Sequence, residues 1–210
     1  MKHFDMKTII SIVITTSLIS AIIVPFIIDI AKHIGAIDKP GKRKIHLKPM
    51  PRLGGLAIYG GFLVGYMLFS KQSIQMNSIL IGSFLIILTG VIDDIRPMRP
   101  ITKFAGQTLA ALVIAFYGGM VLDKISAFNI IIDFGILAYP LTIFLILAIV
   151  NSINLIDGLD GLAAGISSIF FLTVGIIAVI LGRVDGLDVT LSFIMLGSTL
   201  GFLFHNFYPA

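Results

Sequence analysis

Two short polar segments interrupt the long apolar runs of this chain, and their side chains could bind a metal ion. The first, "GVIDDIRPMRPITK" at residues 90–103, contains the adjacent pair Asp93 and Asp94. Neighbouring carboxylates repel each other unless a cation neutralises them. Hard oxygen ligands suit Mg²⁺ or Mn²⁺, and Mg²⁺ usually takes one or two carboxylates together with substrate phosphates. The pair therefore indicates a divalent metal site; a solvated helix end with Arg96 and Arg99 as ionic partners is the alternative.

The second segment, "NSINLIDGLDGLAAG" at residues 151–165, places a polar side chain at every third position: Asn151, Asn154, Asp157 and Asp160. Residues three apart lie on neighbouring positions of one helix face. Asn154 and Asp157 are therefore expected to project together, with Asp160 beginning to rotate away. The glycines between them allow a close backbone approach to a ligand. A polar turn with capping residues is the alternative, and it explains one or two such side chains better than four.

A third segment, "DKPGKRKIHLKPMPRLGG" at residues 38–55, is strongly basic and includes Lys48. Lysine and arginine neutralise phosphate groups, so a phosphate-rich substrate is one interpretation. A basic cytoplasmic loop, which also attracts anionic lipid headgroups, is the other.

The composition identifies the setting of these segments. Hydrophobic residues make up 57% of the 210 residues and charged residues only 12%, against about 25% charged in soluble domains. This excludes an ordinary soluble domain and indicates an integral membrane protein; no nucleic acid is expected as a partner. The chain has no cysteine, so no disulfide can form. The first apolar run is too long for a signal-peptide core, so we expect it to remain as an uncleaved span.

Apolar stretches of about 20 residues are long enough to cross a bilayer as helices. We expect one all-α polytopic membrane domain over residues 1–210, with about seven transmembrane helices at 8–31, 53–69, 78–92, 104–122, 134–150, 162–182 and 189–208.

The basic residues predict the orientation. The loops 32–52, 93–103 and 151–161 would share one side and hold ten of the fifteen lysines and arginines. An excess of positive charge marks the cytoplasmic side, so the N-terminus is expected outside and the polar segments at the cytoplasmic face of the plasma membrane. Carboxylates, a metal and phosphate-binding cations together indicate phosphoryl transfer, in which positioning and charge neutralisation do most of the catalytic work.

The three quoted segments, in this order and spacing, resemble signatures of the polyprenyl-phosphate N-acetylhexosamine-1-phosphate transferases, and the resemblance covers nearly the whole chain. The "DKPGKRKIH" form resembles the undecaprenyl-phosphate GlcNAc-1-phosphate transferase branch, and looks less like the phospho-MurNAc-pentapeptide transferases. The resemblance implies transfer of a sugar phosphate from a UDP-N-acetylhexosamine to undecaprenyl phosphate at the cytoplasmic leaflet, with Mg²⁺ as cofactor and UMP as leaving group. It also implies a homodimer, since family members often dimerise.

The resemblance further implies roles for individual residues. Asp93, Asp94 and Asp157 would be catalytic, with Asp93 activating or orienting the lipid phosphate. Asn154 and Asp94 would hold the metal ion.

Substrate-binding roles are implied for Lys48, Lys103 and Asp160. The family pattern continues past Ala210 with another metal-binding aspartate and a nucleotide-contacting loop, so we expect a C-terminally truncated member that is inactive alone. Transfer of sugar phosphate by the purified 210-residue chain would contradict this expectation.

Two other functions fit part of the sequence. A secondary transporter would use aspartates at the membrane edge as proton relays, although the acids cluster at one face and no inverted repeat is visible. A non-catalytic subunit that binds lipid phosphate would keep the scaffold without the chemistry. The sugar also stays open, with UDP-MurNAc-pentapeptide as an alternative donor.

Overall fold

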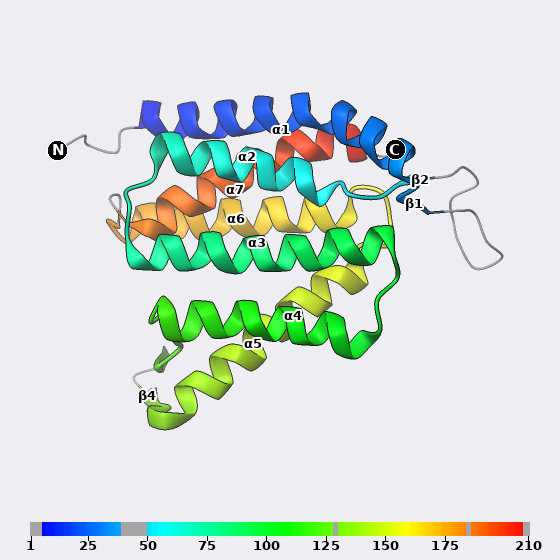
Figure 1. The fold of residues 1–210 in the computed structure, drawn as a ribbon. Coiled ribbons are helices and arrows are strands. Elements are labelled where there is room, and N and C mark those ends of the chain that lie inside the picture. Colours follow the sequence, from blue (N-terminus) through cyan, green and yellow to red (C-terminus); the bar gives the residue numbers. More distant parts are fainter. Residues whose placement is uncertain (1–5, 39–49, 128–129, 184–185, 208–210) are drawn as a thin grey trace. The chain divides into compact units, whose positions relative to one another are not determined.

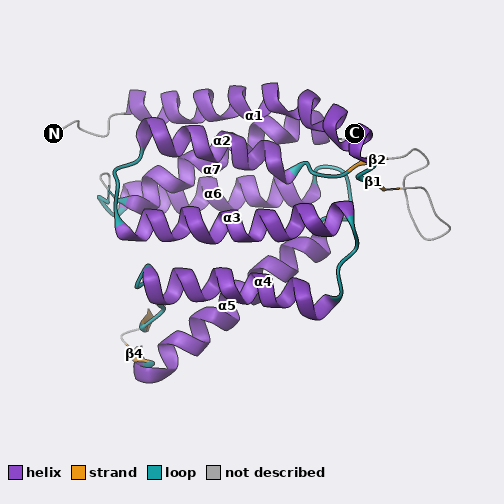
Figure 2. Cartoon of the chain, in the orientation of Figure 1, coloured by secondary structure: helices purple, strands orange, loops and turns teal. Residues whose placement is uncertain are grey.

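The computed structural model describes residues 6–38, 50–127, 130–183 and 186–207. These residues form seven α-helices and two pairs of short strands (Figures 1 and 2), which confirms the all-α prediction. They fall into two compact units. Unit 1 takes its residues from Met1–Ser70 and Ile156–Ala210, and unit 2 from Lys71–Leu155.

Unit 1 is a bundle of four helices: α1 (Met6–Ile34), α2 (Gly55–Phe69), α6 (Leu162–Ile180) and α7 (Leu187–Asn206). α7 packs against each of the other three. It is the most buried of the long apolar helices in the described part of the chain. The core of unit 1 therefore lies around α7.

Glycines on α7 allow the backbones of α1 and α7 to touch. A Cβ atom at Gly201 would overlap the carbonyl group of Ser17, and one at Gly197 would overlap the side chain of Thr16. A buried hydrogen bond of 2.9 Å, from Ser168 Oγ to Thr199 Oγ1, ties α6 to α7. Small residues and interhelical hydrogen bonds of this kind hold helices together in lipid, where hydrophobic burial gives little driving force.

The exit of the basic segment is a shaped turn in unit 1. Strand β1 (Ile37–Asp38) pairs antiparallel with β2 (Met50–Pro51), and the amide of Arg52 donates to the carbonyl of Ala36 over 2.9 Å. Leu53 is buried and has a φ of 76°. That left-handed conformation is costly for a residue with a Cβ, so burial of the leucine side chain must offset it.

Unit 2 contains three helical segments that run up and down. α3 (Ile74–Ile95) begins after Ser73, whose side chain accepts a 3.1 Å hydrogen bond from the amide of Met76. α4 (Pro100–Leu112) begins with proline at its first position, where the missing N–H costs nothing, and continues as the π-helix η1 (Val113–Tyr117). α5 (Ala138–Ile156) follows.

A β-hairpin joins η1 to α5. It consists of β3 (Lys124–Ala127) and β4 (Ile130–Asp133), and the 3₁₀ turn η2 (Gly135–Leu137) leads into α5. The sequence analysis did not predict this hairpin. The alternation of direction brings the C-terminal end of α3, the N-terminal end of α4 and the C-terminal end of α5 together, as the side-chain contacts described below show.

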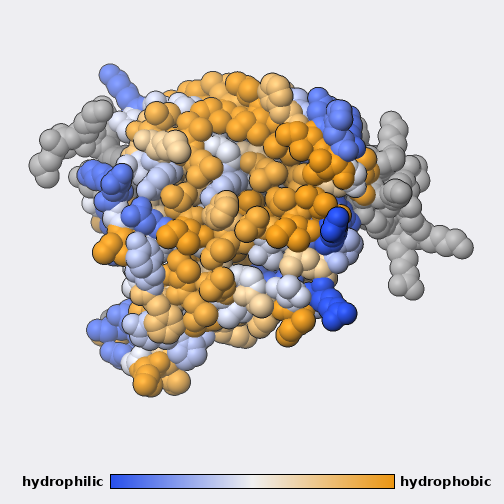
Figure 3. All heavy atoms as spheres, in the orientation of Figure 1, coloured by the Kyte–Doolittle hydropathy of each residue, from blue (hydrophilic) through white to orange (hydrophobic). Residues whose placement is uncertain are grey.

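Five helical segments among the described residues are long and apolar enough to cross a membrane: Met6–Ile34, Ile74–Ile95, Gly135–Ile156, Leu162–Ile180 and Leu187–Asn206. α2 is shorter, with 15 residues, and reaches only about 22 Å at 1.5 Å per residue, against about 30 Å of hydrocarbon. Figure 3 shows hydrophobic residues over the helix sides in view and hydrophilic residues near helix ends. The chain is a multi-pass membrane protein.

Candidate functional site

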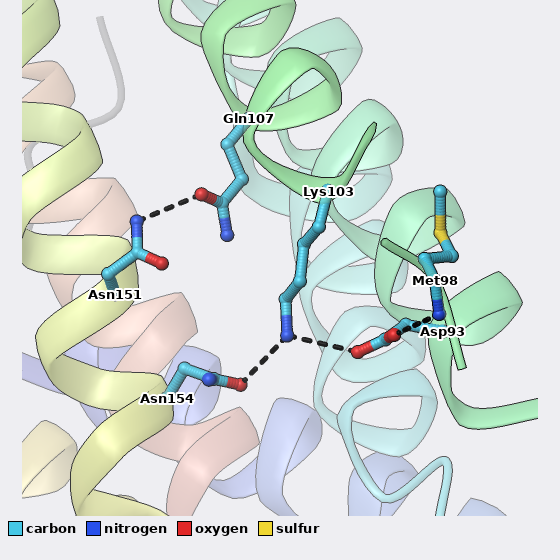
Figure 4. A network of polar contacts seen from close by, with 6 residues as sticks. All are labelled: Asp93, Met98, Lys103, Gln107, Asn151 and Asn154. Carbon is cyan, nitrogen blue, oxygen red and sulfur yellow. Dashed lines mark hydrogen bonds and ion pairs between the residues drawn. The ribbon is translucent and has the colours of Figure 1, made fainter. Parts of the chain in front are cut away.

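A cluster of polar side chains joins the three helix ends of unit 2 (Figure 4). Asp93 lies in the last turn of α3, and both of its carboxylate oxygens are engaged. Oδ1 accepts a 2.9 Å hydrogen bond from the backbone amide of Met98, and Oδ2 forms a 3.0 Å ion pair with Lys103 Nζ on α4. Both charged side chains are 26% exposed. The carboxylate is thus fixed in position and still reachable from solvent.

Lys103 also reaches α5. Its Nζ donates a hydrogen bond of 3.4 Å to Asn154 Oδ1, next to its contact with Asp93 (Figure 4). One ammonium group therefore gathers oxygen atoms from two other helices. Asp93 and Lys103 were predicted as site residues in the segment 90–103 and Asn154 in the segment 151–165, and the structure brings these three together. Their roles stay predictions.

A second contact between α4 and α5 lies beside the first. Asn151 Nδ2 donates to Gln107 Oε1 over 2.9 Å and to the carbonyl of Leu147 over 2.8 Å. Gln107 is only 4% exposed. Lys103 and Gln107 are four apart on α4, while Asn154 and Asn151 are three apart on α5, so each pair shares one helix face. This partly buried amide contact joins α4 and α5 beside the point where Lys103 meets Asn154.

This contact predicts a measurable coupling between Gln107 and Asn151. In a double-mutant cycle of Gln107→Met and Asn151→Ala, we expect a coupling free energy of about 0.6 kcal/mol, the average for interhelical hydrogen bonds in membranes, and at most about 1.7 kcal/mol. Unfolding of the chain in mixed micelles measures it. The matched cycle of Gln107→Met with Ser126→Ala, on the hairpin, should be additive to within about 0.5 kcal/mol. Equal coupling free energies in the two cycles would show that the hydrogen bond between Gln107 and Asn151 does not contribute to stability.

The other predicted site residues are Asp94, Lys48, Asp157 and Asp160. Asp94 lies beside Asp93 in the last turn of α3 and is partly exposed. Lys48 lies outside the described residues. Asp157 and Asp160 lie in unit 1, in the turn that leads to α6. Their predicted membership of one site with Asp93 stays a prediction.

The prediction that Asn154 and Asp157 share a helix face is wrong, because α5 ends at Ile156. The assignment of 151–161 to a loop is also wrong in its first half, since Asn151 and Asn154 are helical. The helix continues through them because the carbonyl of Leu147 and the side chain of Gln107 satisfy the amide group of Asn151. Polar side chains with such partners do not compete with the helix backbone.

The turn after α5 is hydrogen-bonded to a side chain at the end of α7. The amide of Gly161 donates a 3.0 Å hydrogen bond to Asn206 Oδ1, at the end of α7.

Asp157 keeps an exposed surface, but nearby protein atoms partly desolvate its carboxyl group and raise its pKa. A raised pKa makes the carboxylate a stronger base, which suits a catalytic role. Asn206 was missed by sequence reasoning, since no local signal links it to a glycine far along the chain.

Gly161 has a φ of +71°, and a Cβ added there would lie 3.2 Å from Leu203 Cδ1 and 3.4 Å from the carbonyl oxygen of Asn206. We expect Gly161→Ala to lower the free energy of unfolding by about 1–2 kcal/mol, the cost of a left-handed conformation.

The control is Gly165→Ala on α6, where a Cβ meets nothing within 4 Å. It should be neutral or stabilising by about 0.5–1 kcal/mol. Unfolding of both variants in mixed micelles measures the difference, and a Gly161→Ala variant as stable as Gly165→Ala would contradict the proposed strain.

The donor set of the cluster fits a hard divalent cation. Asp93 and Asn154 offer a carboxylate and an amide oxygen that already converge on one positive charge, Lys103 Nζ, and Asp94 follows Asp93 in the chain. Within the described residues, no group of three or more histidine, cysteine, aspartate or glutamate side chains is arranged to hold a metal ion. A cation here would thus complete its shell with water or phosphate oxygens, as Mg²⁺ commonly does.

Comparisons with known proteins identify the family of the chain. Residues 76–210 match the glycosyl transferase family 4 model. The chain is 43% identical over 191 residues to a Bacillus subtilis protein named "Probable undecaprenyl-phosphate N-acetylglucosaminyl 1-phosphate transferase", covering 90% of this chain and 53% of that protein. It is 34% identical to a decaprenyl-phosphate N-acetylglucosaminephosphotransferase of Mycolicibacterium smegmatis, covering 94% and 53% respectively.

A more distant relative is the undecaprenyl-phosphate alpha-N-acetylglucosaminyl 1-phosphate transferase of Escherichia coli K12, which is 25% identical over 82% of this chain and 48% of its own length. The chain spans about half the length of the curated relatives it matches. The predicted family resemblance is confirmed: the chain belongs to glycosyl transferase family 4.

Proposed function

We propose that the protein transfers N-acetylhexosamine-1-phosphate from a UDP-sugar to a polyprenyl phosphate, as a step of cell-envelope glycan synthesis. The observation that carries this proposal is the placement of Lys103 Nζ between Asp93 Oδ2 and Asn154 Oδ1 at one end of unit 2. A cation held between oxygen ligands, at the end of membrane helices, suits a phosphate group whose lipid tail stays in the bilayer.

Each residue of the cluster has a role in the proposed reaction. Lys103 binds a phosphate oxygen of the substrate. Asp93 orients the lipid phosphate and accepts its proton if that phosphate arrives protonated. An oxygen of the lipid phosphate then attacks the sugar-linked phosphorus of the UDP-sugar. The new P–O bond replaces the P–O bond to UMP, which leaves, and the step needs no oxidant or reductant.

Asn154 and Asp94 would hold Mg²⁺, with Mn²⁺ as a substitute of similar ligand preference. The ion would supply charge neutralisation for the diphosphate. Asp157 is proposed as a further catalytic carboxylate, and Lys48 and Asp160 as substrate-binding residues.

We place this end of unit 2 at the cytoplasmic face. Arg96, Arg99 and Lys103 lie at the Asp93 end, against Lys71 and Lys124 at the opposite helix ends of the unit. The excess of positive charge supports a cytoplasmic position and agrees with the supply of nucleotide sugars in the cytoplasm.

The names of the relatives support the substrate classes. The Bacillus protein is named for undecaprenyl phosphate and the mycobacterial protein for decaprenyl phosphate, and both names specify N-acetylglucosamine. We therefore propose UDP-N-acetylglucosamine as donor and undecaprenyl phosphate as acceptor. UDP-MurNAc-pentapeptide is the alternative donor to compare.

The test is a transfer assay with the complete protein in membranes. Radiolabelled UDP-N-acetylglucosamine and undecaprenyl phosphate should yield a labelled lipid and an equal amount of UMP, and EDTA should stop both. A secondary transporter would instead give proton-coupled flux in liposomes without UMP, and a lipid-binding subunit would bind the lipid phosphate without releasing UMP. Either of those results would overturn the proposal.

A further inference from the structure

The hairpin β3–β4, at the end of unit 2 opposite Asp93, has one apolar and one mainly polar face. Its register pairs Lys124 with Asp133 and Ser126 with Ile131, and between them it pairs Ile125 with Ile132 and Ala127 with Ile130. Directly paired residues point to the same side, and successive pairs alternate. Ile125, Ile130 and Ile132 therefore share one face, while Lys124, Asp133 and Ser126 share the other with Ile131.

The apolar face is uncovered in the structure. Ile125 is 43% exposed, Ile132 51% and Ile130 63%. The next turn, η2, continues this surface, with Ile136 87% and Leu137 63% exposed. Contiguous exposed apolar side chains of this size mark an interaction surface.

Aromatic side chains lie at the same end of the unit. Phe116 and Tyr117 close η1, Tyr139 opens α5, and all three are exposed. The rings of Phe116 and Tyr139 stack with their centroids 4.8 Å apart. Exposed tyrosine at helix ends marks the level at which a membrane surface meets water. The hairpin is therefore attached where the bilayer interface should lie.

We propose that the apolar face of the hairpin lies in the headgroup–acyl boundary of the lipid leaflet at this end of unit 2. The hairpin leads after one residue, Phe134, into the candidate membrane span Gly135–Ile156, whose Phe144 is also exposed. The hairpin cannot enter the hydrocarbon core, because its open strand edges need water. On its polar face Lys124 and Asp133 form an exposed ion pair of 3.9 Å, which belongs on the water side.

The chain has no tryptophan, so a single introduced tryptophan reports on one position without background. Ile132→Trp tests the apolar face, and Ser126→Trp is the control on the opposite face of the same hairpin. Both positions are exposed, so neither substitution disturbs a packed core. The full chain is reconstituted in phosphatidylcholine vesicles with bromine either near the carbonyl end or near the methyl end of the acyl chain.

The emission of Ile132→Trp should be blue-shifted and quenched about twofold or more by bromine near the carbonyl end, and less by bromine near the methyl end, as expected for interfacial depth. Ser126→Trp should emit as in water and be quenched little. Ile125→Trp, on the same face as Ile132, should repeat the Ile132→Trp result.

Two results would overturn the inference. Water-like emission from Ile132→Trp in every vesicle would show that the face is solvated. Blue-shifted emission without bromine quenching would show that protein, such as a second copy of the chain, covers it.

Discussion

Replacing Asp93 by asparagine is expected to slow sugar-phosphate transfer by about 10²–10⁴-fold, the usual contribution of a positioned acid–base group. Asparagine keeps the size of the side chain and an oxygen that can accept from Met98, so the loss should come from the missing negative charge. That charge holds Lys103 at 3.0 Å and would orient the lipid phosphate. The effect should appear mainly in kcat, measured with the complete protein in membranes.

The control for this substitution is Asp133→Asn. Asp133 also pairs with a lysine, but at 3.9 Å, on the exposed hairpin at the opposite end of unit 2. Its variant should transfer within about twofold of wild type, because exposed ion pairs contribute little. A normal rate for Asp93→Asn, or an equal loss in Asp133→Asn, would remove Asp93 from the reaction.

Replacing Lys103 by methionine is expected to cost about 10²–10³-fold in transfer, the effect of removing one donor from a preorganised charge-stabilising site. Methionine keeps much of the aliphatic chain and loses only the ammonium group. Asp93 Oδ2 and Asn154 Oδ1 would then lose the cation that now lies between them. The substrate phosphate would lose a direct partner.

Two further variants sharpen this prediction. Lys103→Arg should recover only part of the activity, because a planar guanidinium cannot occupy the position of a compact ammonium group. Lys124→Met, which removes the hairpin lysine, should leave transfer within about twofold of wild type. Full activity in Lys103→Met would show that the ion pair with Asp93 serves only the fold.

Hydropathy and residue chemistry predicted much of this structure. The apolar runs predict seven helices. In lipid the backbone N–H and C=O groups must hydrogen-bond within the segment, so a continuous apolar stretch is expected to form a helix. Asp93 and Asn154 stood out as polar side chains beside long apolar runs, and Lys103 was added by the family resemblance. Their meeting point could not be derived from local pattern, since it depends on how α3, α4 and α5 pack.

The errors have physical causes as well. The segment from Asn151 was assigned to a loop because the apolar run ends at residue 150, yet Gln107 and the carbonyl of Leu147 allow the helix to continue to Ile156. Gln107 could have been found from its spacing of four residues after Lys103. The hairpin at 124–133 was missed because this segment, between the predicted spans 104–122 and 134–150, was not examined for strand pairing.

The cooperation of Asp93 and Lys103 is tested most directly by the transfer rate of the double variant Asp93→Asn/Lys103→Met beside the two single variants. Residues that act as a unit show strongly non-additive losses, so the double variant should fall within about threefold of the slower single variant. A loss in the double variant equal to the product of the two single losses would mean that the two side chains act independently. That result would contradict a shared phosphate-binding cluster at the ends of α3, α4 and α5.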